Sequence, residues 1–275
     1  MSGSVAERRG SGVTARGLAL GLGLSLFLLP LAWTMLAAFG IVPNNELRPP
    51  AFAGRPTLEN FVETGVAEPT FWLEVWTSSA SAVCAAGIAT VTGLLAAYAL
   101  ARGARRRGRT IAQCFLVLAV LPPMAYALPL GSVLDWLRLR DSFVGLVTSE
   151  AAVTAPLAVY VLHGAIRQVP EEYEEAAWIE GAGVARLIGR VVLPIVAPSV
   201  AATGIVLFVL NWNMLLVPLI AAGIHVKTIP VAMADFFTFE RELEWPVAAA
   251  ALLVSLVPVA LLVAFSRRLL DRFSL

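Results

Sequence analysis

The residues best suited to recognition gather in one charged stretch, residues 167–197, between two long apolar runs. It reads RQVPEEYEEAAWIEGAGVARLIGRVVLPIVA. Pro170 suits the first position of a helix, where its missing amide costs nothing. The acids that follow complement the positive end of a helix dipole; they are Glu171, Glu172, Glu174 and Glu175. A short helix is therefore predicted to begin here.

A glycine turn divides this stretch into two arms. Gly181 and Gly183 supply the permissive backbone that a turn needs. Residues 184–192 can then form a second helix, which we expect Pro194 to end. A connection as long as residues 167–197 is usually functional in a compact protein.

One face of the first predicted helix carries small side chains. At helical spacing, Tyr173, Ala176, Ala177 and Glu180 share this face, and the two alanines let another protein approach closely. The alternative is an amphipathic helix lying on the membrane surface. Because an anionic leaflet would repel the four clustered acids, we interpret the face as a docking surface.

Two polar groups lie inside apolar runs. Glu150 stands seven residues into the run 143–166, roughly 10 Å deep at 1.5 Å per residue. A charge at that depth is costly and marks a candidate functional site. We expect it to face a solute cavity, where it would hold water or accept from a solute hydroxyl; an inter-helix hydrogen bond or a protonated buried acid is the alternative.

A second polar group, Asn211, Trp212 and Asn213, combines an aromatic ring with two amides. Sugar sites use this combination. Packing between helices is the alternative, because asparagine side chains also bridge helices in a bilayer.

The sequence shows no pattern of a catalyst. Cys84 and Cys114 both lie inside apolar runs and match no metal-binding spacing. There is no nucleotide-binding loop and no nucleophile or HExxH pattern. We therefore expect no enzyme activity, no metal and no cofactor in this chain. A membrane enzyme and a stand-alone transporter remain the competing classes.

These groups must be positioned by membrane-spanning helices. The 275 residues are 59% hydrophobic and 14% charged, whereas soluble domains are about 25% charged. Six apolar runs approach or exceed the length that crosses about 30 Å of hydrocarbon; they are residues 17–40, 75–101, 111–130, 143–166, 198–222 and 245–266. Only helices satisfy their own backbone in such runs. The expected fold is all-α, with six transmembrane helices in one domain over residues 17–275.

The basic residues predict the orientation. Of the 20 lysines and arginines, 14 fall on the side of the amino-terminal segment 1–16, which places both termini in the cytoplasm by the positive-inside rule. Five arginines cluster between the second and third runs: Arg102, Arg105, Arg106, Arg107 and Arg109. We interpret them as a topology determinant, with lipid or partner binding as the alternative. Their placement in short connections offers no surface for nucleic acid.

Three pieces of the charged stretch resemble a known family. Glu175-Ala176-Ala177, then Gly181-Ala182, then Leu193-Pro194 are similar in type and spacing to the EAA motif of binding-protein-dependent ABC importer permeases. In that family this loop forms coupling helices that sit in a cleft of the ATPase subunit. The resemblance implies that Glu175 to Ala177, Glu180 to Ala182 and Leu193-Pro194 couple this chain to an ATPase.

The rest of the chain resembles the shorter, six-helix partner of maltose-type sugar permeases. The matching pieces are PTLENF from Pro56, AAYALAR ending at Arg102, the charged stretch itself, the Asn-Trp-Asn group and TIPVAMADF from Thr228. Glu180 stands where an aspartate is usual in this group, and Met214 where glutamate is frequent.

The resemblance also implies partners and a location. These are a second permease subunit, two ATP-binding subunits that hold ATP and Mg, an extracytoplasmic solute-binding protein and the bacterial inner membrane. It implies a sugar or oligosaccharide as solute, with glycerol-3-phosphate or another polar solute as the alternative.

Overall fold

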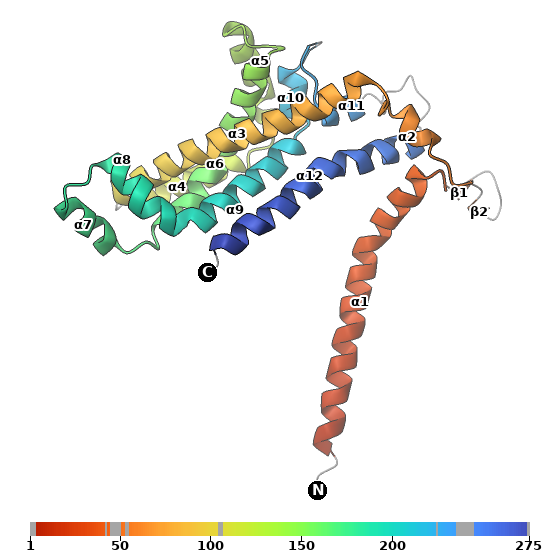
Figure 1. Cartoon of the computed structure of the whole chain (residues 1–275), viewed down its shortest axis with the longest axis horizontal. Helices are drawn as coiled ribbons and strands as arrows, with labels where there is room; N and C mark the ends of the chain where they lie inside the picture. Colours follow the sequence, from red (N-terminus) through yellow and green to blue (C-terminus); the bar gives the residue numbers. More distant parts are fainter. Residues whose placement is uncertain are drawn as a thin grey trace. The chain divides into compact units, whose positions relative to one another are not determined.

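The computed structural model describes residues 4–41, 43–44, 51–52, 55–103, 107–223, 225–234 and 245–273. These residues are almost entirely helical (Figure 1). The chain divides into two compact units, Met1–Ala67 with Phe239–Val254, and Glu68–Thr238 with Ser255–Leu275.

The first unit begins with α1 (Ser4–Ala38). It continues with β1 (Pro43–Asn44) and β2 (Ala51–Phe52), which pair antiparallel, and with α2 (Glu59–Glu63). The Phe39 and Phe61 rings lie 5.3 Å apart between centroids, and Asn60 Nδ2 donates to the Ala38 carbonyl over 3.0 Å. These contacts fix the end of α1 against α2. The helix α12 (Trp245–Phe273) begins in this unit.

The second unit is built on three long helices, α3 (Pro69–Arg102), α6 (Phe143–Ile166) and α9 (Leu193–Trp212). Figure 1 shows them side by side, and each contacts the other two. The shorter elements are α4 (Gly108–Ala119), α5 (Met124–Trp136), α7 (Glu171–Ile179), α8 (Val184–Leu187), the π-helical turn η1 (Ile188–Val192), α10 (Leu216–Ala221) and α11 (Ile229–Ala234).

Small residues set the close packing of α3 on α6. Ala85, Ala89 and Ala97 on α3 and Ala158 on α6 are fully buried. A Cβ added to Gly93 would come within 2.5 Å of Ala158 Cβ. In lipid, where apolar surface alone does not drive helices together, such close backbone approach supplies the van der Waals contact that holds them.

The described residues contain four helices long and apolar enough to cross a membrane. They are Leu20–Ala38, Pro69–Arg102, Phe143–Ile166 and Val184–Trp212. The pair α4 and α5, which meet at 88°, makes a fifth if it is one broken span, and Trp245–Ala260 is a shorter apolar helix. The chain is therefore an all-helical membrane protein with four to five candidate spans in its described part.

Two expected helices are broken in the structure, and two others begin earlier than expected, α1 at Ser4 instead of residue 17 and α3 at Pro69 instead of residue 75. The run 111–130, expected as one helix, breaks between α4 and α5 at Pro122 and Pro123, because proline lacks an amide and disfavours helical geometry in the residue before it. The run 198–222 is also broken, between α9 and α10. The run 143–166 coincides with α6.

The expectation that Pro194 ends the second short helix is wrong. The chain passes from α8 through η1 directly into α9, with Pro194 in the first turn of α9. A proline ring in a helix clashes with the carbonyl four residues earlier. Here that residue, Arg190, lies in the wider π-helical turn, which lets the helix continue past the ring.

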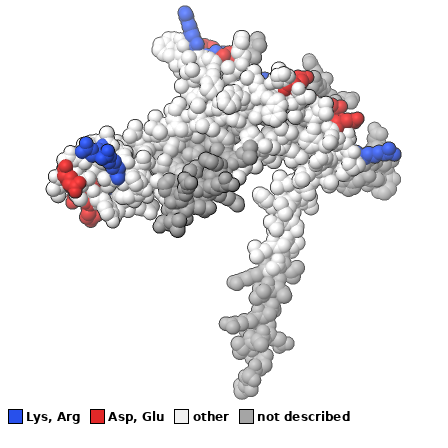
Figure 2. All heavy atoms as spheres, viewed as in Figure 1, with Lys and Arg blue, Asp and Glu red and all other residues white. Residues whose placement is uncertain are grey.

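On the face drawn in Figure 2, the charged side chains described for the second unit lie near its ends, whereas Glu150 is buried inside it. Figure 2 shows acidic and basic side chains over α7 and α8 and again around the tip of α5, with an uncharged surface between them. A band without charge is what the hydrocarbon layer of a bilayer requires.

The Gly93 contact yields a matched test. Gly93→Ala should lower the free energy of unfolding of the purified protein by about 1–3 kcal/mol, because the new methyl overpacks the α3–α6 contact. Gly87→Ala on the same helix meets nothing within 4 Å and should be neutral or stabilising. Thermal unfolding in lipid nanodiscs measures both, and equal midpoints for the two variants would contradict the packing argument.

Candidate functional site

The helix α7 is closed at both ends as its residue types require. Pro170 is its N-cap (φ −59°, ψ 135°) instead of its first helical residue, and acids fill the first turn. At the other end, Gly181 takes φ +79° and donates its N–H to the Trp178 carbonyl over 2.9 Å. The Ala182 N–H reaches the Ala177 carbonyl at 2.9 Å. Left-handed backbone strongly favours glycine, so Gly181 defines where α7 ends.

The outer side of α7 is an exposed surface of mixed character. Ile179 is 88% exposed and Tyr173 58%, and Ala177 is half-buried. The other residues of the expected docking face, Ala176 and Glu180, are exposed, and so is Glu175 beside them. This surface, Tyr173 to Glu180 without the buried Glu174, is called the α7 face below. Large apolar side chains beside small and acidic ones are typical of a protein contact.

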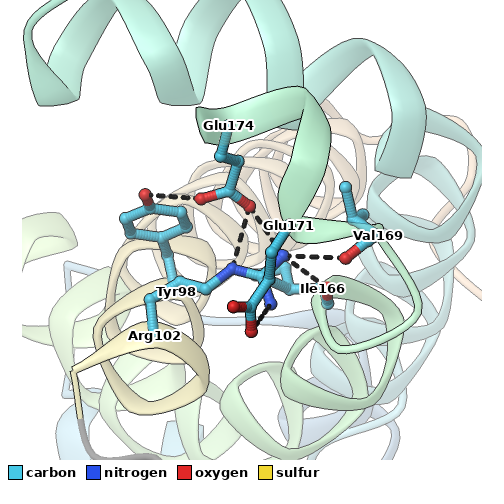
Figure 3. A network of polar contacts seen from close by, with 6 residues as sticks. All are labelled: Tyr98, Arg102, Ile166, Val169, Glu171 and Glu174. Carbon is cyan, nitrogen blue, oxygen red and sulfur yellow. Dashed lines mark hydrogen bonds and ion pairs between the residues drawn. The ribbon is translucent and has the colours of Figure 1, made fainter. Parts of the chain in front are cut away.

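The inner side of α7 is held by an ion pair with α3. The Glu174 and Arg102 side chains are only 6% and 16% exposed. Arg102 Nε and Nη2 both donate to Glu174 Oε1, over 2.8 and 2.6 Å, and the Tyr98 hydroxyl donates to Oε2 over 3.0 Å (Figure 3). Hydrogen bonds between charged groups are about twice as strong as neutral ones, so this contact anchors α7.

The same guanidinium also reaches the end of α6. Arg102 Nη2 donates to the carbonyls of Val169 and Ile166, over 2.9 and 3.3 Å. Its Nη1 lies 3.7 Å from Glu171 Oε1. Figure 3 shows the side chains converging where α3, α6 and α7 meet. One arginine therefore joins three helices, and we call this contact the Arg102 junction.

The Arg102 junction was missed by sequence reasoning. The sequence alone places Arg102 among the arginines that set topology, and Glu174 among the acids that complement a helix dipole. Tyr98 and Arg102 are four residues apart and so share a face of α3, which was the available signal. Their partner, more than 70 residues away, has no local signature.

The second arm of the stretch is continuous with the core. Leu187 on α8 and Val192 in η1 are fully buried. Leu193 is half-buried against the cluster formed by α3, α6 and α9, while Pro194 is exposed. The α7 face is thus attached twice, through Arg102 to α3 and α6 and through α8 and η1 to α9.

Glu150 lies inside the helix bundle. It is 1% exposed, and its carboxylate is within hydrogen-bonding reach of the Ser81 hydroxyl on α3. Its Oε2 has no hydrogen-bond partner among the described residues. These contacts are those of the alternative interpretation, in which Glu150 makes a hydrogen bond between helices.

The Asn-Trp-Asn group divides between core and surface. Trp212 is 4% exposed and stacks on Phe208, with ring centroids 6.1 Å apart. Asn211 is buried, and its amide finds no partner in the described part of the chain. Asn213 is exposed and donates to the Val209 carbonyl over 2.7 Å. Trp212 therefore offers no open aromatic platform in this chain; its contacts are those of helix packing.

A model of the family "Binding-protein-dependent transport system inner membrane component" matches residues 89–274, which include the Arg102 junction and the α7 face. The chain belongs to this permease family. It is a multi-pass inner-membrane permease of a binding-protein-dependent ABC transport system, in which the ATPase is a separate subunit. The permease itself has no catalytic activity.

Individual relatives agree with this assignment. The permease is 28% identical over 255 residues to the sulfoquinovosyl glycerol transport system permease protein SmoH of Agrobacterium fabrum, covering 92% of this chain and 89% of that one. It is 31% identical to the trehalose transport system permease protein SugB of Mycobacterium tuberculosis, covering 66% and 68%. A bacterial ABC transporter that imports the acidic polysaccharide alginate has the same fold, with a TM-score of 0.71, 17% identity and coverage of 98% and 99%.

The structure brings no metal-binding group together in the part of the permease that it describes. No cluster of three or more histidine, cysteine, aspartate or glutamate side chains has the required geometry there.

Removal of the Glu174 carboxylate tests the Arg102 junction. Glu174→Ala leaves a largely buried guanidinium with only the more distant carboxylate of Glu171 as counter-charge, and should lower the free energy of local opening of α7 by about 2–3 kcal/mol. Amide hydrogen exchange in α7 should then accelerate about 30- to 150-fold. Glu172→Ala, at an exposed position on the same helix, is the control, and equal exchange in the two variants would rule out an anchoring role.

Proposed function

We propose that this permease forms the solute pathway of an ATP-driven importer together with a second permease subunit, and that the α7 face docks on the ATPase. The observation that carries the proposal is the construction of α7. Its outer side is exposed, while its inner side is fixed by the Arg102 junction.

This construction suits the transmission of force. A movement of the ATPase that displaces α7 acts on α3 and α6 through Arg102, and on α9 through α8 and η1. Those three helices form the core of the second unit. Packed helices have discrete arrangements and do not deform continuously, so a displacement at α7 is expected to shift the whole helix group between states.

The proposed topology has six spans, with both termini in the cytoplasm. The four long candidate spans, the bent pair α4 and α5, and the helix beginning at Trp245 account for six crossings. The excess of arginine on the side of α7 gives the orientation. The segment 1–16 then lies in the cytoplasm, and residues 17–275 form one permease domain.

The proposed partners follow from the missing chemistry. The sequence has no nucleotide-binding loop, so two ATP-binding subunits would hold ATP and Mg. A related, longer permease subunit would complete the pathway as a heterodimer, and an extracytoplasmic binding protein would deliver the solute.

The proposed solute is a sugar or oligosaccharide. The relatives named above include permeases for trehalose and for a sugar-glycerol conjugate. Within this chain, Glu150 and Asn211 keep polar atoms without partners among the described residues, and they are the groups that a rearranged bundle would offer to hydroxyls. A glycerol-3-phosphate-type anion is the alternative solute.

The glycine turn gives a test of coupling. Gly181→Val places a β-branched residue at φ +79°, which costs about 1–2 kcal/mol and should distort the end of the α7 face. ATP-dependent uptake should fall at least fivefold, with a normal amount of permease in the membrane.

Gly183→Val is the matched control for this test. Gly183 has φ −74°, and an added Cβ there meets nothing within 4 Å, so that variant should keep most of its uptake. Full uptake by Gly181→Val would sink the coupling role of the turn.

The solute class is tested with the assembled importer. The binding protein loaded with a disaccharide or oligosaccharide should raise ATP hydrolysis several-fold in proteoliposomes. The same protein offered glycerol-3-phosphate should not. Stimulation by the anion alone would replace the sugar with the alternative solute while leaving the importer class intact.

A further inference from the structure

Two hollows lie along the contact of α4 and α5 with α6, which is called the α4–α6 seam below. The proposed function uses neither of them. The first has a volume of about 610 Å³ and lies at the junction of the start of α4 with the end of α6. Its polar lining consists of Arg109, Gln113, Tyr160, His163 and Arg167. An added Cβ at Gly164, which also lines it, would meet nothing within 4 Å, so there is open space over this part of α6.

The second hollow is apolar. It has a volume of about 380 Å³ and lies between the α4–α5 bend and the middle of α6. Its lining includes Leu118, Leu121, Leu130, Val153 and Pro156. None of its lining residues is charged.

The two hollows follow one another along the same face of α6. Val153, Pro156, Tyr160, Gly164 and Arg167 line them in sequence, and their spacing of three or four residues keeps them on one face of a helix. The seam therefore changes along its length from an apolar end inside the membrane to a cationic end where α6 stops.

The cationic end lies at the depth of lipid headgroups. Arg167 is the C-cap of α6, and Arg109 is the second residue of α4. In the orientation proposed above, both lie at the cytoplasmic surface, where anionic lipids give the leaflet its negative potential.

The two guanidiniums have no counter-charge within the described chain. No described carboxylate lies within ion-pair distance of Arg109 or Arg167. By contrast, Arg102, the last residue of α3, is engaged in the Arg102 junction. His163, buried against the backbone of Gly108, forms the floor of the cationic hollow. This end of the seam is built to receive an anion.

We propose that the α4–α6 seam binds an anionic phospholipid, with its phosphate at Arg109 and Arg167 and an acyl chain in the apolar hollow. A free phosphate would use only the cationic end. A lipid uses both ends, in the order and at the depth in which the seam presents them. The proposal gives Arg109, at the start of the third span, a lipid-binding role in addition to its effect on topology.

The test is lipid retention by the assembled importer. Native mass spectrometry of importer purified from nanodiscs should show bound phosphatidylglycerol but not phosphatidylcholine. Each of the variants Arg109→Gln and Arg167→Gln should lower retention about fivefold, and Gly164→Leu, which fills the hollow and changes no charge, should lower it as well. Arg190→Gln, at an exposed arginine on η1 outside the seam, should retain the lipid.

Three outcomes would overturn the assignment of a lipid to the α4–α6 seam. They are equal retention in the Arg109→Gln and Arg190→Gln variants, displacement by millimolar inorganic phosphate, and a photocrosslinker at Val161 that captures the second permease subunit instead of lipid. Since retention is measured without transport, failure here leaves the coupling role of α7 standing, and failure of coupling leaves the lipid site standing.

Discussion

The position of α7 depends on one buried ion pair, between Arg102 and Glu174. Burial of two charges is costly unless geometry and hydrogen bonding are both good. Here the carboxylate takes three hydrogen bonds, two from Arg102 and one from Tyr98. Arg102 Nη2, which also donates to Glu174, donates in addition to the carbonyls of Ile166 and Val169 at and just beyond the end of α6. Because each group satisfies the others, the junction holds three helices in one arrangement.

The packing of α3 on α6 makes this junction possible. Glycine and alanine at the contact bring the two backbones close, so that an arginine at the end of α3 reaches carbonyls at the end of α6. Bulkier side chains at the α3–α6 contact would separate the helix ends, so that the Arg102 guanidinium would not reach its acceptors. The Arg102 junction thus owes its geometry to apolar contacts between α3 and α6.

The polar groups inside the bundle have fewer hydrogen-bond partners. Glu150 and Asn211 are buried and keep atoms without partners among the described residues, and such atoms cost about 1–3 kcal/mol each. The Arg102 junction satisfies its buried carboxylate, whereas the interior of the bundle keeps polar atoms without partners among the described residues. That distribution suits a protein in which one end is held and the interior rearranges.

Local patterns in the sequence determined the class of the protein and much of its secondary structure. Apolar length predicted the helices, and α6 has the expected bounds; the run of acids and the glycine pair predicted α7 and its turn. These features follow from backbone hydrogen bonding, the helix dipole and the left-handed freedom of glycine, all of which act between near neighbours in the chain. The bend at Pro122 and Pro123 and the passage of η1 past Pro194 were not predicted, because proline is compatible with both an end and a kink.

Only the tertiary structure decided that Arg102 pairs with Glu174, that Trp212 turns into the core, and that Arg109 and Arg167 share one hollow. Each of these depends on which helices become neighbours, and that choice is made by shape complementarity across the whole bundle.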